Sequence, residues 1–251
     1  MPELVYSSII RLAKLGFRAL GQDISITGLE HIPATGPALL AVNHVGYVDF
    51  IYGGVAPERL GRRVRFMAKR ELFDHRITGP IMRACRHIEV DRADGESSLA
   101  VARRFLEEGE LVGIFPEATI SRAMEIKDLK TGAVRIAAET GAPLVPLVLW
   151  GTQRLMTKDH DKDFSRGTAI AIHVGPPVPV TGDAPVAETA ALKAALQGLL
   201  DDAITAYPQH EEGVWWVPAS YGGSAPTLDE AARLDAEERR RRSRAESTPD
   251  D

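Results

Sequence analysis

Short apolar runs alternate with longer helix-like segments between residues 24 and 206, and this alternation limits the fold more than any other feature of the chain. The runs are rich in Val, Ile and Leu, and most of them end at Pro, Gly or a charged residue, as strands do. Such alternation predicts an α/β fold, here a single domain whose central mixed sheet is flanked by helices. We predict strands at 24–29, 38–42, 63–68, 87–91, 111–115, 144–149 and 169–174, and helices at 47–57, 77–86, 96–108, 131–140 and 185–206.

The composition is that of an ordinary globular protein of a reducing compartment. The 251 residues, 44% of them hydrophobic, are enough for one sizeable core. A net charge of -5 argues against nucleic-acid binding, which needs a basic surface. Cys85 is the single cysteine, so no internal disulfide can form, and no Cys/His cluster has zinc-site spacing. The chain lacks a long apolar run that could span a membrane and a signal-peptide pattern, so we expect a cytoplasmic protein without metal or resident cofactor.

Residues 1–22 are predicted to form an amphipathic helix outside the α/β alternation. Ser7, Arg11, Lys14 and Arg18 recur at i, i+4, i+7 and i+11, which places them on one stripe among mostly apolar residues. This pattern suits a helix that lies in a bilayer interface near anionic headgroups, and it also fits a helix packed on its own domain. Because the segment is terminal, we favour the membrane contact and expect a peripheral protein at the cytoplasmic face of the cell membrane.

Residues 207–251 form an extension of different character after the predicted domain of residues 23–206. The run GVWWVPASYGGSAPT has no period, and the residues after it are highly charged. The charged part has helical propensity but no apolar face with which it could pack. We therefore expect this extension to be partly disordered, with a solvated tail.

The stretch NHVGYVD at 43–49 offers the first candidate for catalysis. The predicted strand ends at Asn43 and His44, and Asp49 follows near the start of a predicted helix. Histidine is well suited to take a proton near neutral pH, and a carboxylate on its second ring nitrogen fixes the tautomer. The stretch has no Ser, Cys or Thr as an obvious nucleophile, which favours direct activation of a substrate hydroxyl. By itself the spacing is weak, because an Asp that caps a helix beside a hydrogen-bonded His gives the same pattern.

Polar side chains also follow other predicted strands, at the positions where α/β domains build their sites. In FPEATISR, Glu117, Thr119 and Arg122 crowd together after a buried strand. Lys69 and Arg92 stand near the ends of two further strands and could converge on a phosphate. Each of these residues alone also fits a turn or an ordinary surface charge.

Taken in order, these stretches resemble the four blocks of the glycerolipid acyltransferase superfamily, typified by 1-acylglycerol-3-phosphate acyltransferases. NHVGYVD resembles the block NHxxxxD, CRHIEVDR the block that ends in an acidic residue and arginine, and FPEATIS the block FPEGTRS. APLVPLVLWG resembles the apolar fourth block and could form a wall for an acyl chain. Four ordered blocks over residues 25–175 are far more specific than any one of them. The FPEATISR variant is similar to that of actinobacterial members.

The resemblance implies an O-acyltransferase that needs no cofactor besides its co-substrate. His44 would act as general base on the hydroxyl of an acceptor, which attacks the thioester of acyl-CoA or acyl carrier protein, and Asp49 would orient the base. The acceptor would be a phospholipid precursor such as 1-acylglycerol-3-phosphate. The implied substrate-binding residues are Asn43, Lys69, Arg92, Glu117, Thr119 and Arg122, with Arg92 and Lys69 at the acceptor phosphate.

One position departs from the family pattern and leaves the acceptor open. The arginine of FPEGTRS binds phosphate in the family, but Ile120 holds that position here, Ala118 replaces the glycine, and Arg122 lies two residues further. The alternatives are therefore glycerol-3-phosphate or a glycosylated lipid as acceptor, or a thioesterase or transacylase on the same scaffold. A lipid-binding module without catalysis is a third reading.

Overall fold

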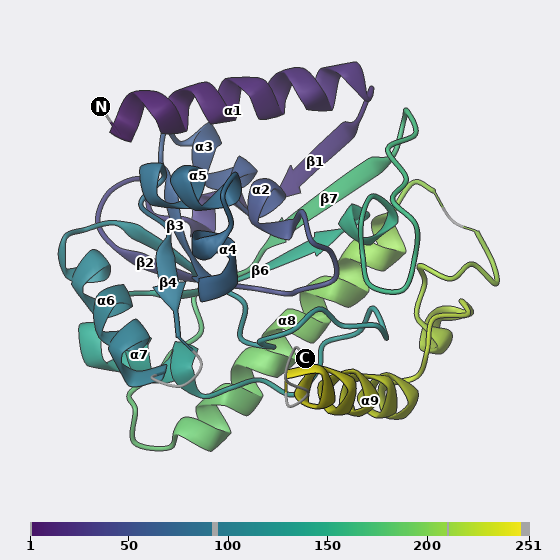
Figure 1. Cartoon of the computed structure of the whole chain (residues 1–251). Coiled ribbons are helices and arrows are strands. Elements are labelled where there is room, and N and C mark those ends of the chain that lie inside the picture. Colours follow the sequence, from purple (N-terminus) through teal and green to yellow (C-terminus); the bar gives the residue numbers. More distant parts are fainter. Residues whose placement is uncertain (1, 92–94, 210, 247–251) are drawn as a thin grey trace, which may run out of the picture.

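A seven-stranded sheet crosses the centre of the molecule and carries helices on both faces (Figure 1). The computed structural model describes residues 2–91, 95–209 and 211–246. Every predicted strand is present, with bounds that differ from the prediction by at most two residues. The strands are β1 (Asp23–Thr27), β2 (Ala38–Val42), β3 (Val64–Lys69), β4 (Ile88–Val90), β5 (Leu111–Ile114), β6 (Leu144–Trp150) and β7 (Ala169–Val174).

The strand order is β1-β7-β6-β2-β5-β3-β4, which puts β2 at the middle of the sheet. All neighbouring pairs are parallel except β6 and β7, so the sheet is mixed, as predicted. β2 is buried along its whole length, which explains why its sequence ALLAV is apolar at every position. The carboxyl ends of β2, β3, β4, β5 and β6 meet at one edge of the sheet, where open α/β sheets build their sites.

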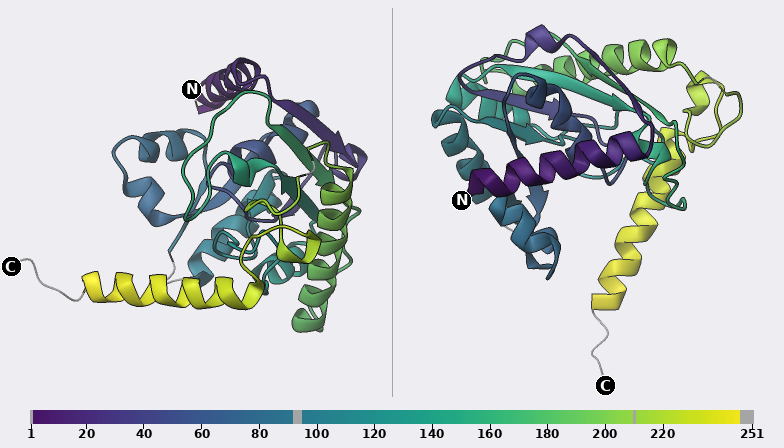
Figure 2. Two further views of the ribbon diagram at one scale, coloured as in Figure 1. Left: turned by 90° about the vertical axis from the view of Figure 1, so that its right-hand side faces the viewer. Right: turned by 90° about the horizontal axis from the view of Figure 1, so that it is seen from above.

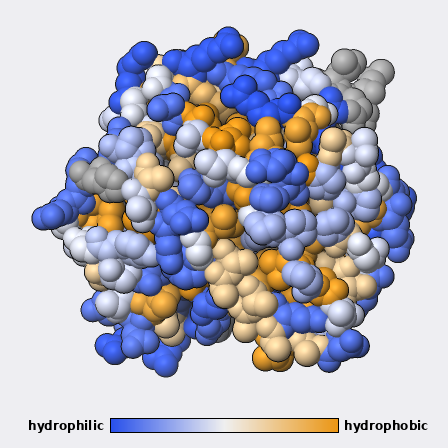
Figure 3. All heavy atoms as spheres, turned by 180° about the vertical axis from the view of Figure 1, so that it is seen from behind, coloured by the Kyte–Doolittle hydropathy of each residue, from blue (hydrophilic) through white to orange (hydrophobic). Residues whose placement is uncertain are grey.

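Two layers of helices cover the two faces of the sheet (Figures 1 and 2). Leu39 and Ala41 of β2 belong to the core on one face, and Leu40 and Val42 belong to the core on the other. The core of Leu39 and Ala41 is covered by α6 (Gly95–Glu107), α7 (Gly132–Thr140) and α8 (Pro185–Ala206). The core of Leu40 and Val42 is covered by α1 (Pro2–Ala19), α2 (Asp49–Gly53) and α3 (Val55–Arg59). On the surface opposite to the view of Figure 1, hydrophobic residues are exposed in patches between polar ones (Figure 3).

The helix predicted at 47–57 is two short helices, α2 and α3, separated at Gly54. Pro57 lies in the first turn of α3 and has no N–H to donate to the carbonyl four residues earlier, so a continuous helix would lose this bond. After β3, α4 (Arg70–Asp74) and α5 (Thr78–Ala84) pack on each other, and α5 also contacts α1.

Helix α1 packs on the domain with one face and leaves an apolar stripe exposed. The hydroxyl of Tyr6 donates to the carbonyl of Val64 at 3.0 Å, and the ring of Phe17 stacks on Tyr52. On the opposite side, Leu12 and Leu15 are 70% and 59% exposed. The two interpretations of the N-terminal segment are therefore compatible, because one face meets the core while another faces outward. Among the described residues, no helix is long and apolar enough to cross a membrane.

The charged end of the chain is a docked helix, α9 (Leu228–Glu246), where the sequence led us to expect a solvated tail. Ala231 and Asp235 are buried, and Glu238 lies on the same stripe one turn further. Ion pairs from this stripe to basic residues of the domain hold α9 in place. The expectation was wrong for these residues because it required an apolar face, whereas this helix docks through charges. Residues 247–251 lie outside the described part.

Candidate active site

The strand-to-helix turn after β2 folds Asp49 back onto His44. The Nδ1 atom of His44 lies 2.9 Å from Oδ2 of Asp49, which is fully buried at the start of α2. The imidazole of His44 keeps 20% of its surface exposed and stacks on Phe115, the residue that follows β5. The pair therefore combines a buried carboxylate with a ring that can still reach a substrate.

Three donors besides His44 surround the carboxylate of Asp49. The backbone N–H groups of Val45 and Gly46 donate to Oδ2 at 2.7 and 2.8 Å, and the hydroxyl of Thr152 donates to Oδ1 at 2.6 Å. A carboxylate can only accept hydrogen bonds, so in its bond with Asp49 the Nδ1 atom of His44 is the donor and carries the proton. The Nε2 atom is then the acceptor of the ring, as a general base requires.

Glycine at position 46 lets the turn close around this carboxylate. A Cβ at Gly46 would lie 3.1 Å from the carbonyl oxygens of Met156 and Thr152 and 3.2 Å from Oδ1 of Asp49. A side chain there would push the turn away from the loop after β6. Gly46 thus serves the close approach of two backbones.

Glu117 supports the backbone of the turn that carries His44. Its buried carboxylate accepts the N–H of His44 at 2.8 Å and the N–H of Lys127 at 3.1 Å. Burial raises the pKa of Glu117 to about 7, against the lowering effect of these two N–H donors. Both oxygens are therefore engaged with the backbone, and the carboxylate shapes the site by fixing the position of His44.

Asn43 was expected to bind substrate, but in the structure its amide bonds to the protein backbone. Its amide is fully buried, donates to the carbonyl of Leu149 at 3.1 Å and accepts the N–H of the same residue at 2.7 Å. These two bonds extend the pairing of β2 with β6 past the end of the ladder. A polar residue at a strand end can satisfy the backbone in this way, so a substrate contact of Asn43 stays a prediction.

Arg122 is also engaged with protein groups in this structure. Its guanidinium bonds to Asp159, Asp235 and Glu238, and only 7% of its side-chain surface is exposed. Three carboxylates therefore occupy the donors of Arg122, and its expected role in substrate binding stays a prediction. Ile120 itself is buried.

Two lysines that the sequence did not single out complete this basic cluster. The ammonium of Lys127 donates to the hydroxyl of Thr119 at 2.6 Å and lies 3.6 Å from Asp235. Lys158 contacts Asp235 at 3.2 Å and Glu238 at 2.9 Å. Neither lysine belongs to one of the four acyltransferase blocks. Both contact carboxylates of the distant α9, so no local sequence signal identifies them.

Of the remaining predicted residues, Lys69 lies along the same edge of the sheet, at the end of β3. Its backbone pairs with Val90 of β4, while its side chain is exposed and its ammonium has no hydrogen bond or ion pair within the described part of the chain. Its neighbour Arg70 forms an ion pair with Asp91 at 3.0 Å, beyond the end of β4. Arg92 lies outside the described residues.

Ala118 stands in a left-handed backbone conformation, with a φ of 62°, where the family pattern has glycine. This conformation is unfavourable for a residue with a Cβ. We expect Ala118→Gly to raise the free energy of unfolding by about 0.5–1 kcal/mol, after allowing for the greater entropy of unfolded glycine. Urea denaturation measures this change. In the exposed interior of α8, Ala191→Gly should instead lower it by about 1 kcal/mol, and equal signs in both variants would contradict the strain at Ala118.

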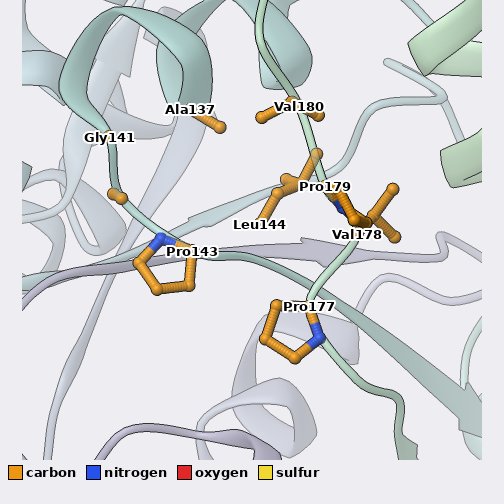
Figure 4. Close-up of a pocket in the computed structure, with 9 residues that line it drawn as sticks. Ala137, Gly141, Pro143, Leu144, Pro177, Val178, Pro179 and Val180 are labelled. Carbon is orange, nitrogen blue, oxygen red and sulfur yellow. The ribbon is translucent and has the colours of Figure 1, made fainter.

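A pocket of about 270 Å³ whose side chains are all apolar lies at the opposite edge of the sheet, where β6 begins (Figure 4). It has no titratable or nucleophilic side chain in its lining, and the carboxyl end of β6 points toward Thr152 and Asp49 instead. The pocket is therefore separate from the candidate active site. Its walls come from Ala137, Gly141, Ala142, Pro143, Leu144, Pro177, Val178, Pro179 and Val180.

Comparison with known sequences identifies the family of the chain. The profile of the Acyltransferase family matches residues 23–150, just over half of the chain. The chain therefore belongs to the acyltransferase family, and the resemblance to the glycerolipid acyltransferase superfamily is confirmed.

Several relatives are named 1-acyl-sn-glycerol-3-phosphate acyltransferases. The protein of Bacillus subtilis (strain 168) is 39% identical over 134 residues, which are 53% of this chain and 65% of that protein. The protein of Borreliella burgdorferi is 28% identical over 173 residues, 66% of each chain. The human alpha form is 29% identical over 182 residues, 70% of this chain and 62% of that protein. The chain thus spans less than two thirds of the length of these relatives.

The fold is shared with a crystal structure of the 1-acyl-sn-glycerophosphate (LPA) acyltransferase, PlsC, from Thermotoga maritima. The two structures superpose with a TM-score of 0.67 over 83% of each chain, at 24% sequence identity. The predicted α/β fold with a mixed sheet is therefore confirmed.

Proposed function

We propose that the protein transfers an acyl chain from a thioester, acyl-CoA or acyl carrier protein, to a hydroxyl of a phospholipid precursor such as 1-acylglycerol-3-phosphate. The observation that carries this proposal is the His44–Asp49 pair, in which a buried carboxylate holds Nδ1 and leaves Nε2 as a base. The names of the relatives support the choice of acceptor.

The reaction follows from the geometry of the pair. Nε2 of His44 takes the proton of the acceptor hydroxyl while the oxygen attacks the thioester carbonyl. Asp49 stabilises the imidazolium that forms, as in Ser-His-Asp triads. The tetrahedral intermediate then collapses, the carbon–sulfur bond breaks, and the imidazolium returns its proton to the leaving thiolate. The products are the new ester and a free thiol.

The acceptor is the least constrained part of the proposal, because Ile120 stands where the family has a phosphate-binding arginine. Lys69, Arg92 and Arg122 are the basic residues proposed for the phosphate, and Arg122 would first have to leave its carboxylate partners. Glycerol-3-phosphate and a glycosylated lipid are the alternative acceptors, and water would make the protein a thioesterase.

Thiol release with a panel of acceptors tests this proposal. The purified protein is mixed with an acyl-CoA or an acylated carrier protein, and free thiol is followed with 1-acylglycerol-3-phosphate, glycerol-3-phosphate, a glycosylated lipid or no acceptor. We expect release that depends on 1-acylglycerol-3-phosphate, with the diacyl product visible by mass spectrometry. Release at the same rate without acceptor would identify a thioesterase instead.

We also propose that α1 docks on the cytoplasmic face of the cell membrane, where the lipid acceptor resides. The exposed stripe of Val5, Leu12 and Leu15 would enter the interface. On the flank of α1, Arg11 and Lys14 line a groove of about 330 Å³ against α3 and the segment after it, together with further basic residues and Glu58, whose carboxylate pairs with Lys14. These cations would lie at the level of anionic headgroups.

Flotation with liposomes tests the membrane contact. Replacing Leu12 and Leu15 together by aspartate should lower partitioning into phosphatidylglycerol-containing liposomes roughly 100-fold, because burying two leucines contributes about 3 kcal/mol. Neither side chain packs in the core, so the fold should persist. Val186→Asp is the matched control, since this valine is 79% exposed on α8. Equal flotation of all three proteins would contradict a role of α1.

A further inference from the structure

Besides His44, the hydroxyl of Thr152 is the only side-chain group in the described part of the chain that hydrogen-bonds to Asp49. Thr152 lies two residues after β6, just beyond the region matched by the family profile. In the sheet, β2 lies between β6 and β5, so Thr152 and the FPEATISR loop that follows β5 are on opposite sides of β2. Both Thr152 and Asp49 are fully buried, so no water competes for the 2.6 Å bond between them. The carboxylate is thus held at Oδ2 by its own turn and at Oδ1 by a distant segment.

The segment around Thr152 is built as a rigid support. Gly151 has a φ of 97°, and a Cβ there would lie 2.2 Å from the carbonyl oxygen of Ala169. The amide of Gln153 accepts the N–H of Gly151 at 2.8 Å and donates to the carbonyl of Trp216 at 3.2 Å. The turn at 151–154 is therefore fastened both to the sheet and to the C-terminal extension.

We propose that Thr152 is a positioning residue for the catalytic pair, a role that rests on the proposed acyl transfer. Its hydroxyl fixes the rotation of the Asp49 carboxylate, so that Oδ2 points at Nδ1 of His44 and the imidazole keeps Nε2 toward the substrate. Without this bond, Oδ1 would be a buried carboxylate oxygen without a donor, and the carboxylate would turn toward other partners. Thr152 itself is buried and does not meet the substrate.

Kinetics of three variants test this role. Thr152→Val keeps the shape of the side chain and removes the hydroxyl, so we expect kcat to fall about 10- to 100-fold with KM nearly unchanged. Thr152→Ser keeps the hydroxyl and should restore most of kcat. Thr157→Val is the matched control, because the Thr157 hydroxyl is also buried and anchors the same turn through the carbonyl of Val45 at 2.6 Å without a bond to Asp49. We expect a similar loss of thermal stability in both valine variants and a kcat near that of the wild type in Thr157→Val.

Proton NMR separates this inference from the proposed reaction. The hydrogen-bonded Nδ1 proton of His44 gives a downfield signal, assigned by its absence in His44→Ala. We expect this signal to remain in Thr152→Ser and to be lost or to exchange with water much faster in Thr152→Val, whether or not the protein acylates any acceptor tested. An unchanged signal in Thr152→Val, or equal losses of kcat in the two valine variants, would overturn the role of Thr152. Failure of the wild type to release thiol would overturn only the proposed reaction.

Discussion

Replacing Asp49 by asparagine is expected to lower kcat about 10³-fold while the protein stays folded. The asparagine can place its oxygen toward the N–H groups of Val45 and Gly46 and its nitrogen toward Thr152, whose hydroxyl can accept as well as donate. The hydrogen bonds of the turn therefore survive in the variant. What is lost is the negative charge that stabilises the imidazolium of His44 in the transition state.

Initial rates of acylation and thermal denaturation of Asp49→Asn measure these two effects separately. A rate near that of the wild type would remove Asp49 from the mechanism. A loss of rate together with collapse of the fold would show that the turn needs the carboxylate for its structure, and the charge argument would not stand. Only a folded and slow variant agrees with the proposed pair.

The second large effect concerns the stability of the fold as a function of pH, through Glu117. Its pKa is about 7 in the folded protein, above the ordinary value of 4.5 that applies when the chain unfolds. The folded state therefore holds a proton that the unfolded state has already released between these two values. The contribution of Glu117 to the free energy of unfolding is fully present below pH 4.5 and is lost as pH rises through about 7.

Denaturation of the wild type and Glu117→Gln at pH 5 and pH 8 isolates this group. The neutral amide does not titrate, so the difference in free energy of unfolding between wild type and variant should change by about 2–3 kcal/mol over this range, to the disadvantage of the wild type at pH 8. The other carboxylates cancel because both proteins contain them. A difference that stays constant with pH would contradict a raised pKa at Glu117.

Much of the fold was predictable because its signals are local. The apolar strand ALLAV, its end at Asn43 and His44, and the return of Asp49 lie within twelve residues. The polar residues after other strands were expected at the same edge, because parallel strands end there. The break between α2 and α3 could also have been foreseen from Pro57.

The partners of the site residues were not predictable, because they come from distant parts of the chain. Arg122 meets Asp235 across 113 positions, and Asn43 meets Leu149 across 106. A local pattern shows that a polar group is present, but not whether a ligand, the backbone or another charge satisfies it. Thr152 had one usable signal, since it follows the predicted strand at 144–149, and polar residues after strands often build the sites of α/β domains.

The C-terminal part of the chain was underestimated for a related reason. Helix α9 has no apolar face and so resembles a solvated segment, yet its stripe of Ala231, Asp235 and Glu238 meets a cluster of cations. Pairing with Arg122, which is nearly buried, makes these contacts less sensitive to solvent screening than surface pairs. The extension thus belongs to the architecture around the site.

The rate of thiol release by His44→Ala, with acyl-CoA and 1-acylglycerol-3-phosphate, tests the central claim most directly. The wild type should release thiol in proportion to the diacyl product formed, and the variant should retain the fold and lose about 10³-fold or more of kcat. The imidazole is partly exposed, so its removal leaves no large cavity in the core. A His44→Ala protein that still acylates the acceptor at a rate close to that of the wild type would show that another residue is the base.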